Sequence, residues 1–228
     1  MTFKAYSGTV KGPYHRKNDL PNQDAVAWSD TGDFIVAAVA DGAGSLKHSG
    51  TGAQAAADTA VRAVLEASTD VDFEDLPELA LLAAQARQKS FEGYKEYGST
   101  LTVIVMTSDG YWASGAVGDS FGVIHRDEGE HRLVTGTPIG DYANITELLT
   151  SDLIHPIYEH GESADGFSLS SDGLEYVAIQ GKEAHPGFWN GLVSKAEDGS
   201  LNVDRFLAWL ESLNKLSDDT TLLTVVTE

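Results

Sequence analysis

Apolar residues in this chain fall into runs whose lengths and periods predict both strands and helices. The run DFIVAAVA at 33–40 is continuous and rich in β-branched residues, which is typical of a strand buried on both faces. The stretch 101–117 places two apolar runs around Ser-Asp-Gly, the pattern of a β-hairpin. Shorter runs predict further strands at 3–10, 23–29, 121–126, 131–134, 166–171 and 220–227.

Helical periodicity fills several of the gaps between these strands. The Ala-rich segment 49–65 predicts a helix whose small side chains allow close packing on a sheet, and an amphipathic pattern predicts a second helix at 74–95. The apolar stripe expected for this second helix comprises Leu79, Leu82, Ala83 and Ala86. Shorter helices are predicted at 173–180, 186–196 and 203–213.

The order of these elements indicates the fold class. Strands and hairpins occur with paired helices between them rather than in regular βαβ alternation, which favours an α+β layered sandwich with antiparallel sheets. No Pro-rich or Gly/Ser-rich linker and no block of like charge marks a boundary. We therefore expect a single domain over residues 1–228.

Composition excludes several classes of function. The 15 Lys and Arg residues stand against 35 Asp and Glu, a formal net charge of −20, so no basic stripe is available for nucleic acid or an anionic membrane surface. The chain has no cysteine, which excludes disulfides and thiolate metal sites. No apolar run approaches the roughly 20 residues that span a bilayer, and no secretory signal is evident, so we expect a cytoplasmic protein.

Four aspartates stand at the ends of short apolar runs, each with a glycine at or near the turn. They are Asp41, Asp119, Asp172 and Asp218. A carboxylate at a strand end is held by rigid backbone yet reachable by solvent, which suits hard divalent cations. Because the four are spread along the chain, they predict a site assembled by folding, as in a metal-dependent hydrolase.

Short motifs in a fixed order resemble the metal-dependent protein phosphatases of the 2C family, in particular a bacterial branch. The family pattern is an Arg followed by an acidic pair, then DGxGG, GxT, GDS, SDG and DDxT, over nearly the whole chain. Asp-Gly alone is mainly a turn signal, but six motifs in the right order are hard to obtain by chance. The matching residues are Arg16 with Asn22-Gln23-Asp24, Asp41-Gly42-Ala43-Gly44-Ser45, Gly98-Ser99-Thr100, Gly118-Asp119-Ser120, Ser171-Asp172-Gly173 and Asp218-Asp219-Thr220-Thr221.

The resemblance implies a four-layer α-β-β-α sandwich, in which helices flank two central antiparallel sheets. It also implies two Mn²⁺ or Mg²⁺ ions at one end of the sandwich, with Asp41 bridging both and the Gly42 carbonyl binding one. Asp172 and Asp218 would hold the other ion, and Asp119 would help to recruit a third, weaker ion. Carboxylates and backbone carbonyls are the ligands that such hard cations prefer.

The N-terminal motif departs from the common family pattern. Asp24 matches the second acid of the pair and is a further candidate metal ligand, whereas Gln23 replaces the usual first acid. Arg16 is the candidate for phosphate binding, since a guanidinium fork matches phosphate oxygens. Its spacing from the Gln-Asp pair is longer than usual, and Lys11 or Lys17 could take its place.

The implied activity is hydrolysis of phosphoserine and phosphothreonine in proteins, by in-line attack of a metal-bridging water and without a covalent phosphoenzyme. The implied partners are a phosphorylated protein substrate and a cognate kinase system, and we expect a monomer. Ala43 stands where many eukaryotic members carry a histidine proposed as general acid, which suggests that metal-bound water protonates the leaving group. His48 is an alternative acid.

Two alternatives stay open on the sequence alone. Residues 118–122 fit G-x-S-x-G, the nucleophile elbow of serine hydrolases, with Ser120 as nucleophile and with Asp172 and His185 downstream. That elbow needs a helix after the serine, and the run after Ser120 predicts a strand. The second alternative is a catalytically weak or inactive binding module that keeps the phosphatase fold, which the Gln23 replacement motivates.

Overall fold

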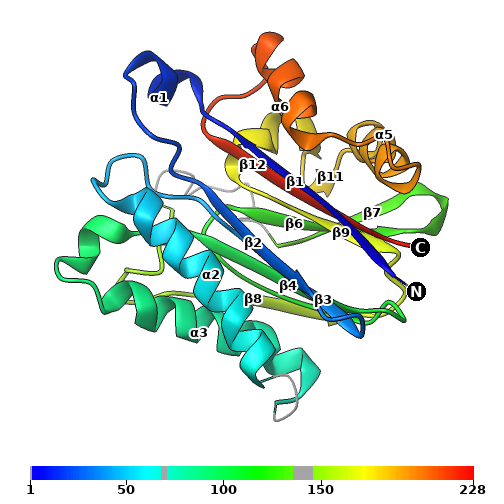
Figure 1. Cartoon of the computed structure of the whole chain (residues 1–228), viewed down its shortest axis with the longest axis horizontal. Coiled ribbons are helices and arrows are strands. Elements are labelled where there is room, and N and C mark those ends of the chain that lie inside the picture. The colour runs from blue at the N-terminus through cyan, green and yellow to red at the C-terminus, as the bar shows by residue number, and fades with distance from the viewer. Residues whose placement is uncertain (1, 68–70, 136–145) are drawn as a thin grey trace.

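Two five-stranded antiparallel sheets stack face to face in this protein, with helices on both outer surfaces (Figure 1). The structure is a computed structural model that describes residues 2–67, 71–135 and 146–228. The strand order is β1-β12-β9-β6-β7 in the first sheet and β2-β3-β4-β5-β8 in the second. The predicted four-layer α-β-β-α sandwich of the α+β class is therefore confirmed.

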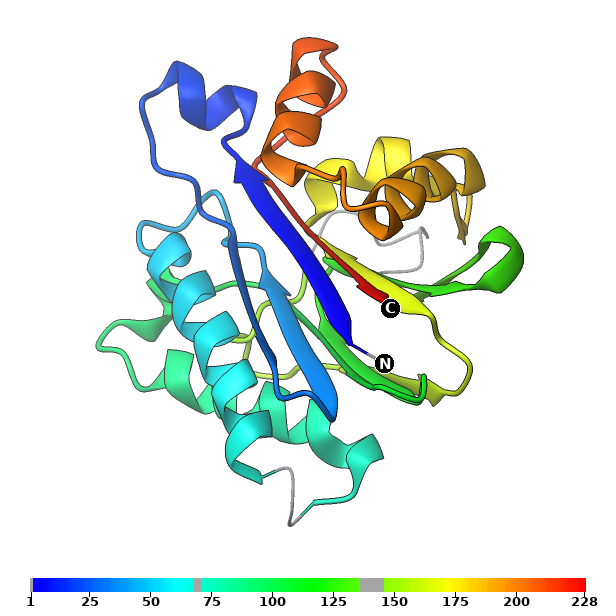
Figure 2. The same ribbon diagram turned by 45° about the vertical axis from the view of Figure 1, so that its right-hand side comes forward.

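The first sheet joins the two ends of the chain. β1 and β12 pair antiparallel from Phe3 opposite Thr227 to Val10 opposite Thr220, and they lie side by side in Figures 1 and 2. This pairing places the start of β12 beside the segment that follows β1. The strands of this sheet are β1 (Phe3–Val10), β6 (Phe121–Arg126), β7 (Glu130–Thr135), β9 (Gly166–Ser170) and β12 (Thr220–Thr227).

The second sheet contains the predicted hairpin and a strand that the sequence does not predict. In the hairpin, Gly110 has a φ of +86°, a left-handed conformation that favours glycine. The unpredicted strand is β8, an edge strand whose sequence IYEHG is mostly exposed and lacks an apolar alternation. The strands are β2 (Ala25–Asp30), β3 (Phe34–Ala40), β4 (Leu101–Thr107), β5 (Trp112–Val117) and β8 (Ile157–Gly161).

The outer layers are two groups of helices, on opposite sides of the sandwich (Figure 2). α2 (Ser49–Ala67) and α3 (Leu76–Lys89) pack on the second sheet, and α5 (Pro186–Glu197) and α6 (Val203–Ser212) pack on the first. Within the described residues, no helix combines the length and the apolar character that a membrane crossing requires. The shorter elements are α1 (Pro13–Lys17), α4 (Glu175–Ala178), β10 (Ile179–Gln180), β11 (Glu183–Ala184) and the 3₁₀ turns η1 (Phe73–Asp75), η2 (Tyr94–Tyr97), η3 (Asp127–Gly129) and η4 (Asp172–Leu174).

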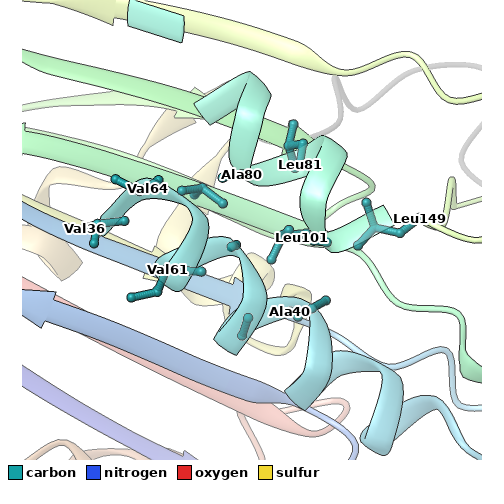
Figure 3. Close-up of a cluster of buried hydrophobic side chains, with 14 of the residues drawn as sticks. Val36, Ala40, Val61, Val64, Ala80, Leu81, Leu101 and Leu149 are labelled. Atoms are coloured by element: carbon teal, nitrogen blue, oxygen red, sulfur yellow. The ribbon is translucent and has the colours of Figure 1, made fainter. Parts of the chain in front are cut away.

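Alternation along β3 distributes its side chains between two hydrophobic clusters, which confirms a strand buried on both faces. Ile35, Ala37 and Val39 belong to the cluster between the sheets, and the intervening residues belong to the cluster under α2 and α3. Figure 3 shows the helix-side cluster, where Val61 and Val64 of α2 lie over the sheet together with Ala80 and Leu81 of α3. Close approach of α2 depends on small, fully buried side chains at Ala53, Ala56, Ala57 and Ala60.

Two of the predicted helices differ from the observed elements. The segment 74–95 is divided, because α3 ends at Lys89 and Gly93 adopts a left-handed φ of +67° before η2. In place of the helix predicted at 173–180, the structure has η4, the single turn α4 and the β10–β11 hairpin. The predicted apolar stripe of α3 was also wrong, since its buried positions are Leu76, Pro77, Ala80, Leu81, Ala84 and Gln88.

Candidate metal centre

The candidate aspartates gather because the antiparallel register brings several strand ends to one edge. Asp24 precedes β2 and Asp41 follows β3, and these strands pair with Ala25 opposite Ala40. Asp119 precedes β6 and Asp172 follows β9, and these strands pair with Phe121 opposite Ser170. One carboxylate oxygen each from Asp41, Asp119 and Asp172 lies within 4.8 Å of the others. The structure thus brings three of the predicted residues together from separate parts of the chain.

Thr100 of the predicted GxT motif holds the backbone of Asp41. The Asp41 amide donates to the Thr100 hydroxyl at 3.0 Å, and the Thr100 amide donates to the Asp41 carbonyl at 2.9 Å. The Thr100 hydroxyl also shares a 2.8 Å hydrogen bond with Ser120, which is fully buried and is followed directly by strand β6. These bonds connect the turns that carry Asp41 and Asp119, a role that the motif spacing does not reveal.

Gly42 occupies a position where no side chain fits. Its amide donates to the Gln23 carbonyl at 3.2 Å, and an ideal Cβ would lie 2.6 Å from that oxygen and 2.8 Å from the Ser49 carbonyl carbon. Glycine therefore allows the turn after β3 to pack against the segment before β2. Two residues on, a Cβ at Gly44 would meet its nearest neighbour, the Gln23 side chain, only at 3.9 Å.

Asp24 is partly buried beside this turn. One of its carboxylate oxygens accepts a 2.7 Å hydrogen bond from the Ser171 hydroxyl, and the other is buried without a hydrogen-bond partner among the described residues. The pKa of Asp24 is raised to about 7, chiefly by burial and also by the negative charges of Asp219 and Asp172, against the opposing effect of the Ser171 bond. The carboxylate is therefore costly to ionise in the absence of a cation.

Asp41 and Asp172 are also costly to ionise in the absence of a cation. Burial raises the pKa of Asp41 well above its usual value, and the charge of Asp24 adds to the effect. Burial, with the charges of Asp119 and Asp218, raises the pKa of Asp172 to about 6. One Asp172 oxygen is also buried without a hydrogen-bond partner among the described residues. Carboxylates crowded in this way, with unpaired oxygens, fit a hard divalent cation.

Asp218 and Asp219 have different environments although they are adjacent. Asp218 is exposed, and its charge contributes to the raised pKa of both Asp41 and Asp172, which places it within electrostatic reach of them. Asp219 is only 3% exposed and its oxygens accept hydrogen bonds from three groups. These are the Gly12 amide at 2.6 Å, the Gln23 amide at 2.7 Å and the His15 Nδ1 at 2.7 Å.

Asp219 therefore ties the loop between β1 and β2 to the start of β12. The sequence does not single out this residue or His15, because their contacts join positions about 200 residues apart. One signal was available, since Asp219 stands beside Asp218 in the Asp-Asp-Thr-Thr motif at the start of β12. Ligand atoms of His15, Asp218 and Asp219 also lie within 4.8 Å of one another, but both Asp219 oxygens already accept hydrogen bonds.

Arg16 is paired with groups other than the candidate aspartates. It lies on α1, where its guanidinium forms an ion pair with Glu211 of α6 and donates to the Lys11 carbonyl. Among the described residues, these contacts are with α6 and with its own loop rather than with any candidate metal ligand. Binding of phosphate by Arg16 would require it to leave Glu211.

Comparisons with known proteins identify the class that this fold and carboxylate cluster define. A family model described as protein phosphatase 2C matches residues 11–216, so the chain belongs to the protein phosphatase 2C family. It is 26% identical over 222 residues to serine/threonine-protein phosphatase 3 of Escherichia coli (strain K12), covering 87% of this chain and 86% of the relative. The family predicted from the sequence motifs is thereby confirmed.

Solved structures share the fold at low sequence identity. The serine/threonine phosphatase PstP/Ppp of Mycobacterium tuberculosis aligns with a TM-score of 0.68 at 19% identity, over 100% of both chains. Stp1 of Staphylococcus aureus aligns with a TM-score of 0.69 at 16% identity, over 100% of this chain and 96% of that one. A PstP catalytic domain in complex with two manganese ions aligns with a TM-score of 0.60 at 18% identity, over 100% and 99%.

Proposed function

We propose that this protein is a serine/threonine protein phosphatase that depends on Mn²⁺ or Mg²⁺. Membership of the protein phosphatase 2C family supports the reaction class. The observation that carries the metal dependence is the meeting of Asp41, Asp119 and Asp172 within 4.8 Å, in a cluster where burial and like charge raise carboxylate pKa values. A bound divalent cation would offset the repulsion and desolvation that disfavour the ionised form of such a cluster.

Each candidate ligand has a role in this proposal. Asp41, the Gly42 carbonyl, Asp172 and Asp218 hold two ions, and Asp119 takes part in a third, weaker site. The chemistry that these ions supply when bound is electrostatic: activation of water and neutralisation of charge on the phosphoryl oxygens. Asp24 lies against the same cluster and adds a further negative charge to it when ionised.

The other residues of the site act by positioning. Thr100 fixes the Asp41 backbone, and Asp219 fixes the loop that leads to Asp24. Because its guanidinium is paired with Glu211, Arg16 contributes to phosphate binding only if a substrate phosphate replaces that carboxylate. We further expect a monomer that acts in the cytoplasm opposite a protein kinase.

Hydrolysis assays on metal-stripped protein test the proposal. With added Mn²⁺ or Mg²⁺ the protein should hydrolyse p-nitrophenyl phosphate and a phosphothreonine peptide, and EDTA should abolish both activities. Activity that persists in EDTA, together with labelling of Ser120 by a fluorophosphonate probe, would indicate a serine hydrolase instead. Mn²⁺ binding without any turnover would indicate the inactive binding module.

A further inference from the structure

An open groove of about 660 Å³ runs along α2 beside the candidate metal centre. Its α2 lining residues recur at helical spacings of three and four, so they share one face of the helix. The C-terminal end of α3 and the segment after it provide another wall with Arg87 and Phe91. Besides Gly50, the α2 residues are Thr51, Gln54, Ala55, Asp58, Thr59 and Arg62.

The charge of this groove is opposite to that of the molecule. Lys47, Arg62 and Arg87 line it against one carboxylate, Asp58, among the described residues, whereas the whole chain carries −20. Within the described residues, neither the Lys47 ammonium nor the Arg87 guanidinium has a carboxylate within 4 Å, and Arg62 has only a 3.9 Å contact with exposed Glu66. The backbone amide of Lys47 donates to the Glu96 carboxylate at 3.3 Å. The groove therefore offers cations to an anionic ligand that the rest of the surface repels.

Aromatic stacking supports the cationic end of the groove. The Arg87 guanidinium lies 4.5 Å from the ring centroid of Phe91, which stacks on Tyr97 at 4.3 Å. Tyr97 in turn stacks on His48 at 5.0 Å, and His48 follows Lys47 at the entrance to α2. Because the rings hold these groups in place, less side-chain freedom is lost when a ligand binds.

One end of the groove meets the candidate metal centre. Asn22 and Gln23 line it, and the next residue is Asp24. The Gln23 carbonyl accepts the hydrogen bond from the Gly42 amide, so the same residue borders both sites. The Gln23 side-chain oxygen is buried without a hydrogen-bond partner among the described residues. The groove therefore ends one residue from Asp24, a candidate metal ligand.

We propose that this groove binds acidic side chains that flank the phosphorylated residue of the protein substrate. The inference rests on the proposed phosphatase function and adds its substrate preference. From Thr51 to Arg62, α2 rises about 16 Å at ~1.5 Å per residue, which matches about five residues of extended peptide at ~3.3 Å each. Acidic residues within about five positions of the phosphoresidue are thus the ones recognised.

Matched peptides test this preference. One phosphothreonine peptide carries Asp and Glu at the flanking positions on both sides, and its partner carries Asn and Gln at the same positions. Wild-type kcat/KM should be higher for the acidic peptide, and the preference should shrink as NaCl rises from about 0.05 M to about 0.5 M. Hydrolysis of p-nitrophenyl phosphate, measured in parallel, reports on the reaction without the flanking residues.

Charge-reversal variants identify the surface responsible. Lys47→Glu with Arg87→Glu should reduce the acidic-to-neutral ratio of kcat/KM by about 3- to 30-fold, and Lys47→Gln with Arg87→Gln should reduce it less. The control Lys182→Glu with Lys195→Glu makes the same charge change at exposed positions in the β10–β11 turn and on α5, outside the groove. The acidic-to-neutral ratio of kcat/KM for this control variant should equal that of the wild type.

The outcomes separate this inference from the function on which it rests. Equal turnover of the two peptides by a protein that hydrolyses p-nitrophenyl phosphate would overturn the groove assignment and leave the phosphatase proposal intact. Equal losses of preference in the groove variant and the control variant would also overturn it, because bulk charge would then explain the effect. No hydrolysis of any of the three substrates would remove both proposals.

Discussion

At the residue scale, adjacent aspartates show how burial separates chemical roles. Asp219 accepts three hydrogen bonds from groups on the β1–β2 loop, whereas exposed Asp218 accepts one from the Asp219 amide at 2.7 Å. Hydrogen bonds to a buried charge are among the stronger polar interactions in proteins. Asp219 therefore organises the loop, and Asp218 is available for a ligand.

Substitution of these two residues should have contrasting effects on stability. Asp219→Asn replaces a carboxylate oxygen by an NH₂ group that faces donors, so we expect a loss of about 2–4 kcal/mol in unfolding free energy. Asp218→Asn should change it by less than about 1 kcal/mol, because that side chain is exposed. Urea unfolding in EDTA measures both, and similar losses for the two variants would contradict the organising role of Asp219.

Removal of a charge from the carboxylate cluster should separate activity from stability. We expect Asp41→Asn and Asp172→Asn to abolish hydrolysis of p-nitrophenyl phosphate even at saturating Mn²⁺. In EDTA the same variants should be more stable than the wild type by on the order of 1–3 kcal/mol, because burial and like charge disfavour the ionised carboxylates. Thermal melts in EDTA test this, and an unchanged or lower melting temperature would argue against a strained cluster.

The sequence locates the clustered aspartates but not their supports. Asp41, Asp119 and Asp172 each carry a local signal, an apolar run that ends at a turn with glycine. His15 carries none, and Asp219 has only its place beside Asp218, because their burial arises from a contact across 204 positions of sequence. The pairing of Arg16 with Glu211 is equally non-local, since it depends on where α6 packs.

At the scale of elements, the turn from β3 into α2 depends on close contact between backbone segments. Gly42 lies against the Gln23 carbonyl and the start of α2, whereas Gly44 faces more open space. The turn therefore tolerates a side chain at one glycine and not at the other.

Alanine substitutions at these two glycines form a matched test. Gly42→Ala forces a Cβ to within 2.6 Å of the Gln23 oxygen, so the turn must shift. We expect a loss of about 1–3 kcal/mol in unfolding free energy and a large drop in activity. Gly44→Ala should retain most of the stability and most of the activity. Equal tolerance of alanine at the two positions would show that the close contact of Gly42 with the Gln23 carbonyl does not matter.

Strands and helices were predicted correctly where the apolar pattern directly reflects which faces of the element are buried. β3 is apolar on both faces because each face packs on a cluster, and a continuous run reports this directly. The stripe on α3 was misplaced because that helix packs on α2 as well as on the sheet, so Leu82 remains exposed while Gln88 is buried. β8 gives no clear pattern because it is a mostly exposed edge strand.

At the scale of the whole molecule, carboxylate strain should give the metal-free protein an unusual pH dependence. The folded-state pKa values of Asp24 and Asp172, about 7 and about 6, lie above the ordinary value near 3.8. Between these limits the folded protein binds more protons than the unfolded chain, so its stability increases as pH falls. The destabilisation is fully present above about pH 7 and disappears as pH falls toward 4.

Urea unfolding between pH 8 and pH 5.5 tests this dependence. In EDTA the unfolding free energy should rise as the pH is lowered. With saturating Mn²⁺ the trend should reverse, because protonation then competes with the bound cation. A free energy that falls with pH in EDTA would show that the carboxylates are not strained in the folded state.

The central claim is that aspartates from distant parts of the chain form one cation site, and calorimetric titration of the metal-stripped protein with Mn²⁺ tests it most directly. At pH 7 we predict binding of two ions per chain. Protons released from the cluster, in particular from Asp24 with its pKa of about 7, should appear as a dependence of the enthalpy on the buffer. Asp41→Asn should remove most of this binding. Wild-type protein that binds no Mn²⁺, or an Asp41→Asn variant that binds two ions with unchanged affinity, would contradict the account.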